Sequence, residues 1–288
     1  MNAECTEPVS TGRYELGEGA RWVDGELHWV DILTGRLLVR RGGADVTLVE
    51  LDVPLGAVAP LAGRPGRWVA AAGTGIAVLD PAAPDPLTWL ARPAEEGVRQ
   101  RMNDATVDPA GRFIAGSMAY AADEQPGAGR LHAVDPDGTV RTIVDGLAIP
   151  NGPVFSPDGT VMYLADSSRN RIDAYPYDVA TGTVGEPRLF AEIEDHWPDG
   201  MAVEADGTVW SAVWGGGAVH RYRPDGSLIE AIPVPATRPT SVCFTESTVY
   251  VTSASMWLDR PSATDGAVFR LPRRVRGAAV PAARLDAC

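Results

Sequence analysis

A turn followed by a short strand recurs six times along this chain of 288 residues, and no other feature restricts the possible folds as much. Each copy reads as a turn, a strand, a break of small residues and a second strand, as in "SPDGTVMYLADSSRNRIDAYPYD" from Ser156. Repeats of roughly 40 to 50 residues are typical of propeller blades built from four strands. The repeat therefore predicts an all-β protein, a six-bladed β-propeller with four-stranded blades. The turn positions are Gly25, Gly66, Gly111, Gly159, Gly207 and Ser247, separated by 41, 45, 48, 48 and 40 residues.

The residues between these turns support strands rather than helices. The chain contains 31 Gly and 24 Pro, and short runs rich in Val, Ile, Trp and Tyr lie between them. One closed ring accounts for the whole length, so we expect a single domain over 1–288 with a repeat-bearing core at about 14–271. An irregular β-sandwich with many hairpins is the alternative.

Composition and charge exclude several partners. A hydrophobic fraction of 45% with 22% charged residues is typical of a soluble globular protein. The net charge of −13 argues against nucleic acid, because binding phosphates requires clustered basic residues. The first residues show no signal peptide, and no apolar run is long enough to span a bilayer, so we expect no membrane partner and a cytoplasmic location.

The cysteines show no paired spacing. Cys5, Cys243 and Cys288 are predicted to be free thiols, with a disulfide between the two terminal ones left open. A structural zinc site is not expected without a CxxC pair or closely spaced histidines.

The register of the repeat aligns four oxygen-bearing side chains. Asn103, Asn151 and Asp199 each lie eight residues before a turn glycine, and Glu18 lies seven residues before Gly25. In a propeller these positions fall beside the strand nearest the axis, so the four side chains are predicted to converge at one end of the channel. The same count gives Val58 and Thr240 in the two remaining blades, which carry no comparable acid or amide.

Four convergent oxygen donors, two of them carboxylates, suit a divalent cation such as Ca²⁺, Mg²⁺ or Mn²⁺. Zn²⁺ or Fe²⁺ would also accept such a site. The alternative is that Asn and Asp before Gly only form turns. His196, three residues before Asp199, is a further candidate for contact with substrate or for support of a ligand.

Four motifs now resemble a known family. "LGEGARW" around Glu18, "RMNDATVDPAGRF" around Asn103, "IPNGPVFSPDGTVMYLADS" around Asn151 and "PDGMAVEADGTVWSAVWGGGAV" around Asp199 are similar to the gluconolactonase, regucalcin and luciferin-regenerating-enzyme family of six-bladed propellers. The resemblance covers the chain from about Tyr14 to Leu271.

The resemblance implies one divalent cation, Ca²⁺ first among the candidates, held by Glu18, Asn151 and Asp199. It also implies that Arg101 and Asn103 contact the substrate, a small-molecule lactone of a sugar acid. Asp166, at the end of "LADS", is a possible supporting residue or a strand-end turn acid.

One departure concerns substrate recognition. Regucalcin-like members carry an acidic residue that helps to bind sugar hydroxyls, whereas "GSMAYAADEQPG" has Tyr120 at that place. We therefore expect Tyr120 to contact the substrate, which is either a sugar lactone or a less polar lactone or ester. Trp197, Trp214 and Trp257 are candidates for apolar walls or for blade cores.

These residues predict hydrolysis by metal-assisted attack of water, with Asp199 as the general base and Arg101 orienting the substrate. The chain contains neither a G-x-S-x-G elbow nor a phosphate-binding G-x-x-x-x-G-K-[ST] loop. Two alternatives stay open: an organophosphate hydrolase resembling a phosphotriesterase, and a calcium-binding propeller without catalysis.

Overall fold

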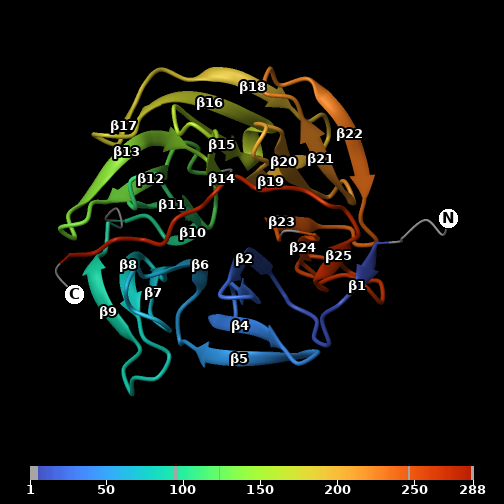
Figure 1. Cartoon of the computed structure of the whole chain (residues 1–288), viewed down its shortest axis with the longest axis horizontal. Helices are drawn as coiled ribbons and strands as arrows, with labels where there is room; N and C mark the ends of the chain where they lie inside the picture. The colour runs from blue at the N-terminus through green and yellow to red at the C-terminus, as the bar shows by residue number, and fades with distance from the viewer. Residues whose placement is uncertain (1–5, 94–96, 123, 246, 287–288) are drawn as a thin grey trace.

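The computed structural model describes residues 6–93, 97–122, 124–245 and 247–286. Within these residues the only helical element is the short 3₁₀-helix η1 (Ser167–Arg169). The strands form six sheets arranged in a ring, as Figure 1 shows. The predicted six-bladed β-propeller is therefore confirmed.

Each blade is an antiparallel sheet, and the first strand of each blade along the chain, apart from β1, lies nearest the axis. The first three blades contain β2 (Gly17–Val23), β3 (Glu26–Asp31), β4 (Arg36–Arg41) and β5 (Ala44–Glu50); β6 (Leu55–Pro60), β7 (Trp68–Ala72), β8 (Gly75–Leu79) and β9 (Leu87–Ala91); and β10 (Gln100–Val107), β11 (Phe113–Ala119), β12 (Gly129–Val134) and β13 (Val140–Leu147). The fourth and fifth contain β14 (Pro150–Phe155), β15 (Val161–Asp166), β16 (Arg171–Asp178), β17 (Thr183–Val184) and β18 (Arg188–Glu192); and β19 (Trp197–Val203), β20 (Val209–Trp214), β21 (Ala218–Tyr222) and β22 (Leu228–Pro233).

The sixth blade closes the ring by joining the two ends of the chain. It contains β23 (Pro239–Phe244), β24 (Val249–Ser253), β25 (Phe269–Leu271) and, as its outermost strand, β1 (Glu7–Pro8). Pro8 is tolerated there because an edge strand leaves one side of its backbone unpaired. The repeat pattern did not predict β1, since a two-residue strand has no periodicity.

A β-bulge interrupts the innermost strand of every blade. β2, β6, β10, β14, β19 and β23 contact one another in this order around the axis. A bulge lets consecutive side chains depart from strict alternation and can direct one of them toward a site. The register shifts lie between Glu18 and Arg21, Leu55 and Ala57, Met102 and Ala105, Asn151 and Val154, Pro198 and Met201, and Pro239 and Val242.

The second blade departs from the register counted on the sequence. Its bulge contains Gly56, whereas Val58 is fully buried in the core between blades. The difference arises because the turn between β6 and β7 is longer than that between β14 and β15. At its bulge this blade has Gly56, which carries no side chain.

The core lies between neighbouring blades. One cluster joins Ala57 and Val69 of the second blade to Val107 and Phe113 of the third. Burying a large apolar side chain contributes about 1.5–3 kcal/mol, so these layers hold the innermost strands in fixed positions.

The C-terminal segment, residues 272–286, crosses the ring at the end opposite the bulges (red trace, Figure 1). Its backbone bonds to three blades: Ala278 N–H donates to Val203 O at 2.8 Å, Ala283 N–H to Pro60 O at 2.8 Å, and Asp286 N–H to Pro136 O at 2.7 Å. Between this segment and the bulges the channel contains a cavity of about 1080 Å³.

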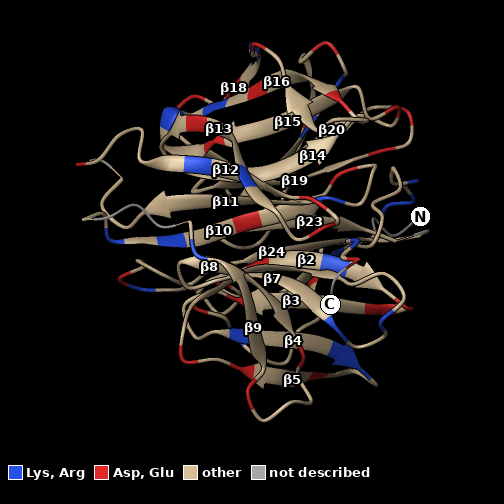
Figure 2. Ribbon diagram, turned by 90° about the vertical axis from the view of Figure 1, so that its left-hand side faces the viewer, with Lys and Arg blue, Asp and Glu red and all other residues tan. Residues whose placement is uncertain are grey.

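Acidic and basic residues are interspersed from β5 to β18 on the side of the ring shown in Figure 2. In the described part of the chain, no helix has the length and hydropathy needed to cross a bilayer.

Cys243 is a buried free thiol, and burial raises its pKa to about 12. Cys5 and Cys288 lie outside the described residues.

Candidate functional site

The bulges bring the predicted oxygen donors together at one end of the channel. Glu18, Asn103, Asn151 and Asp199 come from β2, β10, β14 and β19, and all four side chains are buried. The fifth equivalent position is Thr240, whose hydroxyl instead donates to the backbone oxygen of Gly17. We call these four donors the axial cluster.

The two amides of the axial cluster are linked in a fixed chain of hydrogen bonds. Asn103 Nδ2 donates to Asn151 Oδ1 at 2.7 Å and to Pro150 O at 3.0 Å. Asn151 Nδ2 donates to Ser167 Oγ at 3.0 Å, and the Ser167 hydroxyl donates to Pro198 O at 2.7 Å. These hydrogen bonds determine which atom of the Asn151 amide faces Asn103 in the adjacent blade and which faces Ser167.

The two carboxyls of the axial cluster lie in an unfavourable environment for negative charge. Burial raises the pKa of Glu18 well above its usual value, and the charges of Asp199 and Asp104 raise it further. Burial, and next the charge of Asp104, likewise raise the pKa of Asp199. Glu18 Oε2 accepts the N–H of Gly19 at 2.8 Å, whereas Asp199 Oδ1 is buried without a hydrogen-bond partner among the described residues.

A divalent cation fits this donor set. Buried carboxylates are normally paired or bound to a metal, because an uncompensated buried charge is expensive. The unpartnered oxygen of Asp199 beside a second carboxyl and two amides has the hard oxygen chemistry that Ca²⁺ or Mg²⁺ requires. In the described ranges no three His, Cys, Asp or Glu residues gather as metal ligands, so a cation here would depend on amide oxygens as well.

Asp104 is a neighbour of the axial cluster that the sequence reasoning missed. Its two carboxylate oxygens accept the N–H groups of Ala105 at 2.7 Å and Gly152 at 2.9 Å. It thus joins β10 to β14 and adds negative charge near Glu18 and Asp199. In the sequence, only its position directly after Asn103 indicates that Asp104 lies near the axial cluster. Counting along the repeat missed it, because the count selects one residue per blade.

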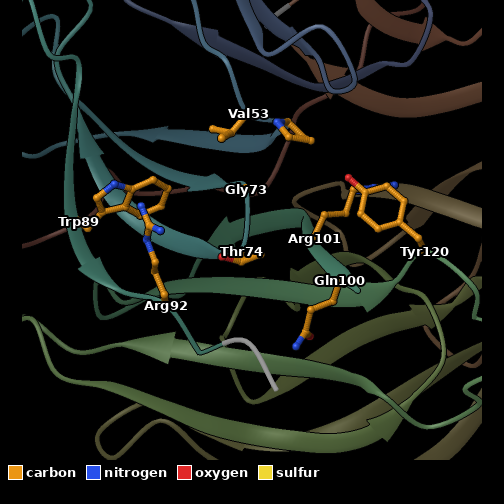
Figure 3. A pocket seen from close by; sticks show the side chains of 9 residues that line it. Val53, Gly73, Thr74, Trp89, Arg92, Gln100, Arg101 and Tyr120 are labelled. Atoms are coloured by element: carbon orange, nitrogen blue, oxygen red, sulfur yellow. The ribbon is translucent and has the colours of Figure 1, made fainter. Parts of the chain in front are cut away.

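Arg101 connects the axial cluster to a separate cavity. Its Nη1 donates to Asn103 Oδ1 at 2.6 Å and to Met102 O at 2.9 Å. The same side chain lines a cavity of about 200 Å³ whose wall also contains Trp89, Arg92 and Tyr120 (Figure 3). Arg101 and Tyr120 therefore line one cavity.

Among the described residues, the hydrogen bonds of Asp166 and His196 do not involve the axial cluster. Asp166 accepts the N–H groups of Ala148 and Ile149 at 3.0 Å each, which holds the segment before β14. The backbone oxygen of His196 accepts a bond from Asn170 Nδ2 at 2.9 Å. These contacts give Asp166 a supporting position.

Three tryptophans form an aromatic group at the same end of the fifth and sixth blades. The rings of Trp197 and Trp214 are stacked at 6.5 Å, and Trp257 meets Trp214 edge-on at 6.0 Å. Trp257 is 70% exposed, so it is not part of a blade core.

The sequence was also compared with models of known protein families. Residues 16–255 match the SMP-30/Gluconolactonase/LRE-like region. The chain belongs to that family.

Relatives and solved structures match this chain over most of its length. A regucalcin of Gallus gallus is 35% identical over 273 residues, 90% of each chain. A pentonolactonase of Haloferax volcanii is 35% identical over 250 residues, 83% of this chain and 81% of that one. The crystal structure of a calcium-binding protein, regucalcin, from Agrobacterium tumefaciens superposes with a TM-score of 0.89 at 30% identity and covers 98% of both chains.

Proposed function

We propose that this protein is a hydrolase that opens a lactone with the help of one divalent cation, Ca²⁺ first among the candidates. The observation that carries the proposal is the buried Asp199 Oδ1, which has no hydrogen-bond partner in the described part of the chain and lies beside Glu18 and two amides. The Haloferax volcanii relative is named a pentonolactonase, which supports the reaction. The Agrobacterium tumefaciens relative is described as a calcium-binding protein, which supports the choice of cation.

Glu18, Asn151 and Asp199 would hold the cation through oxygen atoms. When bound, it would polarise the lactone carbonyl as a Lewis acid and favour the negative charge that develops on the carbonyl oxygen. Asp199 has two carboxylate oxygens, so one can accept a proton from the attacking water while the other faces the cation. The acyl carbon gains the hydroxyl, the ring C–O bond breaks, and the proton passes to the departing ring oxygen.

Arg101 and Asn103 orient the substrate in this proposal. The bonds from Arg101 Nη1 to Asn103 Oδ1 and Met102 O fix the plane of the guanidinium. Its remaining N–H groups then present donors in a defined direction, which a lysine would not do. Tyr120 contributes an aromatic wall to the same cavity.

The first test measures acid release from lactones by the purified protein before and after removal of divalent cations with a chelator. We expect activity to disappear with the cation and to return with Ca²⁺ or another oxygen-preferring cation, whose identity elemental analysis would give. Asp199→Asn should lower kcat by about a hundred- to ten-thousand-fold, the usual range for a general base. Asp225→Asn, in an exposed turn, is the matched control and should keep full activity.

The substrate panel also contains phosphotriesters. Hydrolysis of phosphotriesters alone would favour the organophosphate alternative. Cation binding without turnover of any compound would favour a calcium-binding propeller. Near-normal lactone hydrolysis by Asp199→Asn would show that Asp199 is not the base.

A further inference from the structure

The cavity beside Arg101 is lined by basic and aromatic side chains. It lies between the second and third blades, and Figure 3 shows Trp89 and Arg92 on one side and Arg101 and Tyr120 on the other. No carboxylate occurs among its described lining residues. Its two arginines therefore face no acidic side chain among the described lining residues.

Two guanidinium groups lie on aromatic rings of the cavity wall: Arg92 itself lines the cavity, and Arg99 lies beside it, against Tyr120. The Arg92 guanidinium lies 4.1 Å from the centre of the Trp89 ring, and the Arg99 guanidinium lies 4.8 Å from the centre of the Tyr120 ring. A guanidinium stacked on a ring keeps its N–H donors in its own plane, free to bind a planar anion edge-on. The aromatic residues thus restrict both arginines without using their donors.

Arg92 and Arg99 have no ion-pair partner among the described residues. Over that part of the chain, Arg101 bonds only to neutral oxygens. Ion pairs are not general among the arginines: Arg112 pairs with Asp108 at 2.9 Å and Arg221 pairs with Glu204 at 2.7 Å, whereas Arg188 forms none with a described residue. The charge of the buried Arg101 acts on Glu18 and Asp199, whereas Arg92 and Arg99 are exposed and have N–H groups that a ligand can reach.

We infer that the substrate is a lactone that carries an ionised group, a carboxylate or a phosphate, which Arg92 and Arg99 bind while the lactone carbonyl lies at the axial cluster. The inference rests on the proposed lactone hydrolysis and deepens it. Arg101 lies between the two regions and orients the ring. This substrate class differs from the less polar lactone or ester that Tyr120 suggested, because Tyr120 here serves as the surface under Arg99.

The test compares three lactones with the same ring on the cation-loaded protein: a neutral sugar lactone, the corresponding lactone with a terminal carboxylate, and the one with a terminal phosphate. We expect at least one charged lactone to have a higher kcat/KM than the neutral one. Arg92→Gln and Arg99→Gln should each lower kcat/KM for that lactone by about tenfold, the loss expected for one charge-assisted hydrogen bond, and change that for the neutral lactone less than about twofold.

Arg188→Gln provides the matched control. Arg188 is exposed on β18, far from the cavity along the ring, and the substitution changes the net charge by the same amount. It should leave the ratio of charged to neutral kcat/KM unchanged. A second readout, independent of turnover, is the affinity for the ring-opened dicarboxylate measured by calorimetry, which should weaken in Arg92→Gln and Arg99→Gln only.

The outcomes separate this inference from the proposed function. Faster hydrolysis of the neutral lactone, or equal losses for charged and neutral lactones in the arginine variants, would overturn the inference and leave lactone hydrolysis intact. Absence of hydrolysis for all three lactones would overturn both.

Discussion

At the residue scale, Ser167 determines how the Asn151 amide is oriented. Asn151 Nδ2 donates to Ser167 Oγ, so Asn151 Oδ1 faces the other way, toward Asn103. Ser167 is itself fixed, because its hydroxyl donates to Pro198 O next to Asp199. One buried hydroxyl therefore connects two members of the axial cluster.

Ser167→Ala should weaken cation binding by about 10- to 100-fold, as is typical when a residue that supports a metal ligand is lost. Both Asn151 Nδ2 and Pro198 O lose a partner, which should also lower the free energy of unfolding by about 1–3 kcal/mol. Calcium affinity can be measured by competition with a chelating dye, and stability by urea unfolding.

Ser167→Thr is the control for this change, because it keeps the hydroxyl. It should restore cation affinity toward the wild-type value. Equal cation affinity in Ser167→Ala and the wild type would show that Asn151 does not need this bond to serve as a ligand.

The axial cluster could be predicted from the sequence, whereas its support could not. Glu18, Asn103, Asn151 and Asp199 share a position in the repeat, and the repeat is visible without coordinates. Ser167 lies 31 residues before Pro198 in the chain, and only the approach of two blades brings them together.

At the element scale, glycines allow the innermost strands to approach one another at the axis. A Cβ added to Gly200 would lie 2.7 Å from Ser241 Cβ and 2.7 Å from Thr240 O. In the "PDG" of the fifth blade, Asp199 therefore places a carboxyl group in the axial cluster, and Gly200 lets β19 lie against β23. From the sequence alone, this glycine was expected to form a turn. Its actual role could not be predicted, because local residue types do not show how closely two strands approach.

Gly200→Ala should destabilise the fold by about 1–3 kcal/mol, the usual range for an overpacked core. The contact is with backbone and with a Cβ atom, so no flexible side chain can move aside. The strand β19 must then shift, and Asp199 shifts with it. Urea unfolding would measure the loss of stability, and calcium titration would report the displacement of Asp199.

Gly185→Ala is the matched control. Gly185 is exposed beside β17, and an added Cβ would lie 3.1 Å from its nearest neighbour, the Pro176 side chain. Its effect on stability should be smaller and its effect on calcium affinity absent. Equal effects of the two substitutions would mean that the contact between β19 and β23 does not limit the site.

At the scale of the whole molecule, the ring keeps two acidic groups away from water, and this should make its stability depend on pH and on cations. Burial raises the pKa of Glu18 and of Asp199 in the folded protein. Without a cation the folded state therefore retains protons that the unfolded chain has already released. Because the folded state binds more protons, the free energy of unfolding falls as the pH rises from the ordinary carboxyl range of about 4.

In chelator, the free energy of unfolding should fall as the pH rises above about 4, by at most about 1.4 kcal/mol per pH unit for each group, and the melting temperature should fall with it. Calcium should reverse the loss, and the stabilisation by calcium should grow with pH, because the cation replaces protons that are easier to remove at high pH. Other groups, such as Asp45 with its lowered pKa, titrate in the opposite sense. The double variant Glu18→Gln/Asp199→Asn keeps those groups, so subtracting its melting curve isolates the pair. If the wild type and the double variant show the same pH dependence in chelator, the two carboxyls do not hold protons in the folded state, and a cation would have no proton to displace from them.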